Sequence, residues 1–259
     1  MKKGKIMKKQ IRQKKKLNIS EQHKYDNLMT SYSIFFIYFA ITLLGGVFLR
    51  IILANFLSDE TEISTLINFI VLLIILVLFV AIPNTRSFLV KDAKKYKENS
   101  IKKIVTTVLL AVLFTLLTYY FQKIVLHFVS ETSNNQNIVV NQFIGRFAVF
   151  ALFSSVFFAP IIEEIVFRKG IYLAFNNDKI SFIVSILVFF SIHIISTSFS
   201  NVGAKNYILI ALTYLFPSIL LNIIYRFFGH NIYMSILAHF LNNVLAFTLV
   251  VVAGKFIVG

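Results

Sequence analysis

Long apolar runs separated by short polar segments dominate the pattern of this chain. Seven of these runs are long enough to cross a hydrocarbon core of about 30 Å as helices. They occupy residues 32–57, 63–82, 104–129, 143–175, 180–196, 207–225 and 231–253. Hydrophobic residues make up 58% of the chain and its mean hydropathy is +0.79, far above the values of a soluble domain. The pattern therefore predicts an all-α, polytopic bundle of about seven transmembrane helices.

Basic residues are distributed unevenly between the segments that join these runs. The N-terminal tail and the segments on its side of the membrane hold 21 of the 26 lysines and arginines. Because such residues concentrate in cytoplasmic segments, we expect a cytoplasmic N-terminus and an outer C-terminus in a plasma membrane. We divide the chain into a basic cytoplasmic tail (1–31), N-terminal spans (32–142) and a C-terminal transmembrane core (143–259). The placement of the charges also favours contact with membrane lipid over binding of nucleic acid.

Two adjacent glutamates, Glu163 and Glu164, interrupt the fourth apolar run. An ionisable side chain is costly at membrane depth, so it usually faces the protein interior and has a function. On a helix, Glu164 and Arg168 lie one turn apart and can form an ion pair. Glu163 is rotated by about 100° from Glu164 and has no such partner in the local sequence. We therefore expect Glu164 to be neutralised and Glu163 to remain available.

Three further polar side chains interrupt the late runs: His193 in the fifth, and His239 and Asn243 in the seventh. Counted from the predicted inner ends of the spans, Glu163, His193 and Asn243 lie roughly 18–20 Å deep and His239 about 12 Å deep. We expect these four side chains to meet in a cavity among the last four spans. The other three histidines lie in the tail or at span ends and are expected to be structural or solvated; they are His23, His127 and His230.

These residues resemble three motifs of the CAAX prenyl protease and bacteriocin-processing family, also called the Abi family. The motifs, in order, are Glu163-Glu164-x-x-x-Arg168, Phe189-x-x-x-His193 and His239-x-x-x-Asn243. Members of this family are intramembrane endopeptidases, and the resemblance covers about residues 143–250. It implies that the Glu164–Arg168 pair orders the site, and it implies no cofactor.

The resemblance also implies the roles of the remaining residues. Glu163 would be the general base that activates water, and His193 would help to hold or polarise that water. His239 and Asn243 would stabilise the oxyanion of the tetrahedral intermediate. The expected partners are membrane lipid and a peptide or membrane-protein substrate.

Three other functions fit part of the same set. A protease could instead hold Zn²⁺ on Glu163, His193 and His239, with water in the fourth position. A proton-coupled transporter could use buried glutamates and histidines as a relay, but such proteins usually show repeat symmetry, which this sequence lacks. A non-catalytic bacteriocin-immunity protein on the same scaffold would not need the intact polar set. The sequence contains no cysteine, which excludes disulfides and a cysteine nucleophile.

Overall fold

The structure is a computed structural model that describes residues 22, 24–97, 101–128, 143, 145–175, 177–195 and 204–257. Every regular element in these residues is a helix. Six helices are long and apolar enough to cross a membrane, and Ile232–Thr248 forms a shorter apolar helical stretch. The predicted polytopic helical bundle is therefore confirmed. The tail up to residue 21 and the polar loop 130–137 lie outside the described residues.

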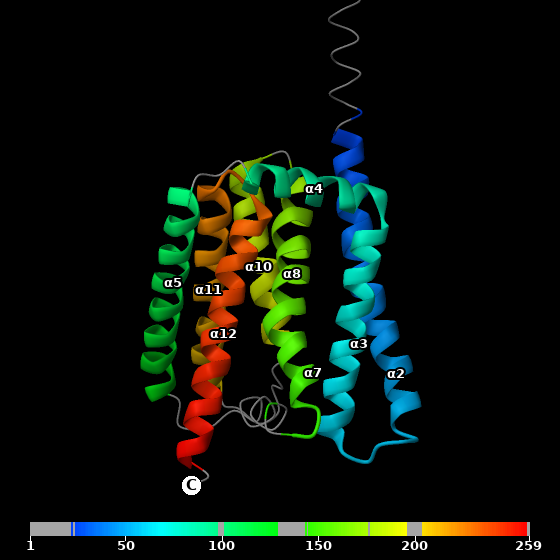
Figure 1. Ribbon diagram of the computed structural model, residues 1–259, viewed down its shortest axis with the longest axis vertical. Coiled ribbons are helices and arrows are strands. Elements are labelled where there is room, and N and C mark those ends of the chain that lie inside the picture. Colours follow the sequence, from blue (N-terminus) through cyan, green and yellow to red (C-terminus); the bar gives the residue numbers. More distant parts are fainter. Residues whose placement is uncertain are drawn as a thin grey trace, which may run out of the picture.

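The long helices run alternately in opposite directions (Figure 1). The first helix, Lys24–Leu53, includes η1 (Ile41–Gly45) and α2 (Gly46–Leu53). The others are α3 (Glu60–Ala81), α5 (Ile101–His127), the helix Ala148–Ala174, α10 (Asp178–Ile195), α11 (Ala204–Phe227) and α12 (Ile232–Ile257). A further helix, α4 (Pro83–Lys97), lies across the end of the bundle where the first helix begins (Figure 1). We call this the α4 end, and we call the opposite end, where α3, α11 and the helix Ala148–Ala174 begin, the distal end.

An N-terminal cap defines the start of α3. Asp59 Oδ1 accepts hydrogen bonds from the N–H groups of Thr61 (2.7 Å) and Glu62 (3.0 Å). Such a cap satisfies amides that have no partner within the helix. The N–H groups of Glu62 and Thr61 also hold the pKa of the Asp59 carboxyl below its usual value. The cap explains why α3 begins at Glu60 rather than at the predicted residue 63.

The helix that carries the paired glutamates begins later than the sequence predicts. The apolar run starts at residue 143, whereas the helix starts at Ala148. The preceding residues form a turn in which the Ala148 N–H donates to the Gly145 carbonyl at 3.1 Å. Glycine loses more conformational entropy in a helix than any other residue, so Gly145 is a natural place for the chain to leave helical geometry.

A buried carboxylate attaches α4 to the bundle. Asp92 Oδ2 accepts a hydrogen bond from Lys169 Nζ at 3.0 Å and one from the N–H of Ile232 at 3.3 Å. The Asn231 side-chain amide donates to the main-chain carbonyl of Asp92 at 3.0 Å. Asp92 is 1% exposed, and it joins α4 to both the glutamate helix and the first residue of α12. Neither this helix nor the burial of Asp92 is predicted from the sequence, which places residues 86–103 in a polar connection.

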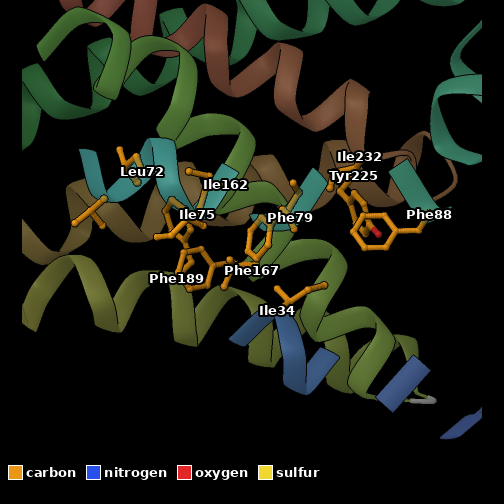
Figure 2. Packing of buried hydrophobic residues seen from close by; sticks show 13 residues of the cluster. Ile34, Leu72, Ile75, Phe79, Phe88, Ile162, Phe167, Phe189, Tyr225 and Ile232 are labelled. Carbon is orange, nitrogen blue, oxygen red and sulfur yellow. The ribbon is translucent and has the colours of Figure 1, made fainter. Parts of the chain in front are cut away.

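Apolar side chains from most of the helices form the core (Figure 2). Phe167 lies at its centre, with its ring edge-on to Tyr38 and to Phe189 at centroid distances of 5.4 and 5.6 Å. Lipid tails are as apolar as these side chains, so close packing rather than removal from water holds such a core together. The buried members of the cluster are Ile34, Val71, Leu72, Ile75, Phe79, Phe88, Ile162, Ile165, Val166, Phe167, Phe189, Tyr225 and Ile232.

Candidate active site

The glutamate helix alternates between α-helical and π-helical hydrogen bonding. Its segments are α7 (Ala148–Leu152), η2 (Phe153–Phe158), α8 (Ala159–Glu163), η3 (Glu164–Gly170) and α9 (Ile171–Ala174). At the end of η2, the Ala159 N–H donates to the Ser154 carbonyl, and the next residue, Pro160, has no N–H. The Ser155 carbonyl would otherwise accept from the N–H at position 159 or position 160. The first of these groups donates to Ser154 and the second does not exist, so the helix supplies no donor for this carbonyl. The side chain of Asn243 in α12 donates to this carbonyl at 2.8 Å. The irregular helix thus fixes the position of Asn243.

Glu164 and Arg168 form an ion pair that is completely shielded from solvent. The Glu164 Oε2 to Arg168 Nε distance is 3.4 Å, and both side chains are 0% exposed. The Arg168 guanidinium also lies over the Phe189 ring, with Cζ 4.3 Å from the ring centroid. Among the described residues, the guanidinium nitrogens have no hydrogen-bond partner. Glu164 and the aromatic ring are therefore the groups that compensate the charge of Arg168.

The second oxygen of Glu164 orients His239. Glu164 Oε1 is 3.0 Å from His239 Nδ1. An ionised carboxylate can only accept, so Nδ1 carries the proton and donates. The other ring nitrogen of His239, Nε2, lies 3.8 Å from Glu163 Oε2. Glu164 therefore links Arg168 to His239 and turns the His239 ring toward Glu163.

His193 reaches Glu163 from the opposite helix, α10. Its Nδ1 lies 2.8 Å from the Phe189 carbonyl, which can only accept, so this nitrogen also carries a proton. Its Nε2 lies 3.8 Å from Glu163 Oε2. The Nε2 atoms of both histidines thus face one carboxylate oxygen, and in neutral rings both are hydrogen-bond acceptors.

Asn243 keeps one proton available for a further partner. Its Oδ1 accepts from Asn242 Nδ2 at 3.3 Å, and one of its two Nδ2 hydrogens is used by the Ser155 carbonyl. The amide has a second Nδ2 hydrogen, and this atom has no partner among the described residues. Because Asn243 lines the same cavity as Glu163, it can donate to a group bound there.

One cavity of about 470 Å³ brings four of the six predicted residues together. Glu163, His193, His239 and Asn243 all line it. Glu164 and Arg168 lie behind the wall and have no exposed surface, whereas the Glu163 side chain is 18% exposed. The structure thus separates the two adjacent glutamates into one accessible and one inaccessible carboxylate, as expected from their helical positions.

The N-terminal helices complete the cavity, which the sequence places only among the last four spans. Tyr38 and Thr42 of the first helix and Asn68 of α3 lie in its wall. Tyr38 and Glu163 thus line the same cavity, although they lie on helices far apart in the sequence. Asn68 could have been noticed from the sequence, because it is the only polar side chain between Thr65 and the end of α3.

The donor types at Glu163, His193 and His239 suit zinc, but their spacing is wider than a zinc site requires. Two ligands of a tetrahedral zinc ion, each at about 2.0–2.1 Å, lie about 3.3 Å apart. Glu163 Oε2 is 3.8 Å from each histidine Nε2. In the described part of the chain, no group of three histidine or carboxylate side chains is arranged to hold a metal ion. The zinc alternative would need these side chains to move closer together, and chelation can test it.

Comparison with known proteins places the candidate site within a family match. Residues 145–245 match a family model described as Type II CAAX prenyl endopeptidase Rce1-like. The UPF0177 protein YaiH of Lactococcus lactis subsp. lactis (strain IL1403) is 36% identical over 150 residues, which cover 56% of this chain and 55% of that protein. The UPF0177 protein YajF of the same strain is 29% identical over 129 residues, which cover 49% of this chain and 62% of that protein. No solved structure matches the chain.

The names of the two relatives state no activity, and the chain matches little more than half of their length. The family match, in contrast, includes all three sequence motifs and all six predicted site residues. It confirms the resemblance drawn from those motifs: residues 145–245 are similar to the CAAX prenyl protease and bacteriocin-processing family.

Proposed function

We propose that this protein is an intramembrane endopeptidase that hydrolyses peptide bonds of membrane-associated or peptide substrates with a water molecule activated by Glu163. The observation that carries the proposal is the position of Glu163 Oε2, 3.8 Å from the Nε2 atoms of both His193 and His239. Each of these two distances is too long for a direct hydrogen bond, and a water molecule at this place can donate to Glu163 and to one of the histidines. A carboxylate within reach of such a water can act as a general base.

The chemistry assigns each proton to a named group. Glu163 takes a proton from water as the water oxygen bonds to the carbonyl carbon of the substrate. The second Nδ2 hydrogen of Asn243 donates to the developing oxyanion, and a His239 ring that has taken a proton from solvent at Nε2 can do the same. Glu164 holds the His239 Nδ1 proton and thereby stabilises that charged ring. When the C–N bond breaks, the proton taken from water passes to the leaving amine. One well-placed oxyanion donor typically contributes about 2.7–4 kcal/mol.

The proposal includes a cytoplasmic N-terminus, an outer C-terminus and residence in a bacterial plasma membrane. The α4 end carries exposed Arg86, Lys91, Lys94 and Lys95. The first helix also begins at this end (Figure 1), preceded in the sequence by nine of the ten basic residues between positions 2 and 24. Concentrated positive charge marks the cytoplasmic side of a membrane protein.

The test compares cells that lack the gene with cells that express either wild-type protein or the Glu163→Gln variant at equal levels. New peptide termini in membrane and secreted fractions are identified by mass spectrometry. We expect termini that appear with wild-type protein and are absent with Glu163→Gln, because glutamine keeps the volume of the side chain but cannot take a proton. A variant that produces the same termini as wild-type protein would refute the role of Glu163 as base.

A further inference from the structure

The cavity extends from Glu163 in only one direction along the bundle. On the glutamate helix the wall continues from Glu163 to Ala159 and Ser155. On each of the other helices the wall likewise runs from a residue near the level of Glu163 to one farther along the helix. These pairs are His239 and Ala246, Phe189 and His193, Leu221 and Thr213, Leu72 and Asn68, and Tyr38 and Thr42. Since neighbouring helices are antiparallel, every one of these steps leads toward the distal end (Figure 1). At 1.5 Å per residue, Ser155 lies about 12 Å beyond Glu163 in this direction.

The opposite direction, toward α4, is closed by packed side chains. Ile34, Ile75 and Phe167 have no exposed surface, and they belong to the core shown in Figure 2. The Glu164–Arg168 pair is equally buried. Beyond this layer, Asp92 holds α4 across the end of the bundle. A separate hollow of about 250 Å³ lies at the α4 end, but none of its lining residues belongs to the cavity around Glu163.

The distal part of the wall has the chemistry of a surface that binds a neutral peptide main chain. Thr42, Asn68, Ser155, Thr213 and Asn242 offer hydroxyl and amide groups, which can both donate and accept hydrogen bonds. Among the described residues, this wall contains no lysine or arginine, and Glu163 is its only carboxylate. An extended chain rises about 3.3 Å per residue, so the distance from Ser155 to Glu163 accommodates three or four residues. A free substrate carboxylate in this stretch would therefore find no lysine or arginine among the described residues.

We infer that substrate enters from the distal, extracytoplasmic end, and that the substrate class is an uncharged, extended peptide segment presented on the outer side of the membrane. The direction of access follows from the wall and from the closed α4 end. The assignment of that end to the outside rests on the charge distribution, and the identification of the occupant as a substrate rests on the proposed function. The inference places the cut inside an exported or outward-facing segment, away from a free C-terminal carboxylate.

Cysteine labelling tests the direction of access without requiring hydrolysis. The chain has no cysteine, so single replacements give an unambiguous signal. Asn68→Cys and Ala246→Cys place a thiol on exposed positions of the cavity wall, and Ser87→Cys on α4 is the matched control at the other end. Intact cells and inverted membrane vesicles are treated with a membrane-impermeant maleimide, and labelled protein is quantified on gels. A permeant maleimide measures the total thiol in each variant.

We expect Asn68→Cys and Ala246→Cys to react in intact cells, and Ser87→Cys to react only in inverted vesicles. Reaction of both cavity thiols only in inverted vesicles would overturn the inference, as would the absence of reaction from either side. If wild-type protein produces new peptide termini, these should map to outward-facing segments, and a cytoplasmic location would also count against it. An absence of new termini would refute the proposed function while the labelling result still decided the direction of access.

Discussion

Replacement of Glu164 by glutamine tests the buried carboxylate separately from the accessible one, Glu163. The amide keeps the volume of the side chain but removes the charge that compensates Arg168. Both side chains are 0% exposed, so water cannot replace the lost partner. An unpaired buried charge costs on the order of 3–5 kcal/mol. In a protein of this size, each kcal/mol changes the midpoint of thermal unfolding by roughly 2–4 °C, so we expect a decrease of roughly 6–20 °C.

Circular dichroism of the purified protein in detergent measures this decrease, since the helical signal does not depend on tryptophan, which the chain lacks. Glu163→Gln is the matched control and should unfold close to the wild-type temperature, because Glu163 has no buried cation to strand. The double variant Glu164→Gln/Arg168→Met removes both charges and should recover most of the loss. Equal unfolding temperatures for the two single glutamine variants, or no recovery in the double variant, would refute the reasoning.

Four further outcomes are expected. Asn243→Ala should lower the turnover of an identified substrate peptide by about 10²–10³ with little change in KM. Asn243→Asp should be comparably harmful, because it adds negative charge beside the oxyanion. Unchanged initial rates would show that Asn243 does not stabilise the oxyanion. Reporter fusions after Lys103 and after Asn135 should lie on opposite sides of the membrane, and a common side would disprove the seven-span topology. Purified enzyme should keep its activity under chelation that inactivates a control zinc protease, whereas loss of activity that stoichiometric Zn²⁺ restores would establish the metal alternative. Asp92→Asn should loosen α4 by weakening its bond to Lys169, which hydrogen exchange of the α4 amides measures; wild-type exchange would show that the ion pair does not hold the helix.

The apolar runs predict the spans well because the bilayer leaves the backbone few alternatives to a continuous helix. The burial of Glu164 and Arg168 follows for the same reason, since a charge at membrane depth needs a partner and the two residues lie one turn apart. The estimated depths bring Glu163, His193 and Asn243 to one level but place His239 about 6–8 Å nearer the inner side, so depth alone anticipates only part of the site.

Other features depend on contacts that no local pattern records. Asp92 lies in a basic, polar segment, and only the packing of α4 across the bundle buries it against Lys169. Nothing in the local sequence distinguishes Tyr38 from other aromatic residues of a span, and only the packing of the first helix places it in the wall of the cavity that contains Glu163. The bond between Asn243 and the Ser155 carbonyl requires the shifted hydrogen bonds of η2. Pro160 indicates an irregular helix, but the sequence does not reveal which side chain donates to the carbonyl that loses its partner within the helix.

The hydrogen bond between Glu164 and His239 also affects how the protein is made. These residues are 75 positions apart, which corresponds to about 4–15 s of synthesis at 5–20 residues per second. During this interval the glutamate helix must remain in the bilayer without α12, although each centrally placed charge makes insertion about 2.5–3.5 kcal/mol less favourable. Entry of α12 then supplies His239 and Asn243 in a single step. A chain that is still being translated therefore lacks His239 and Asn243 beside Glu163 until α12 has entered the bilayer.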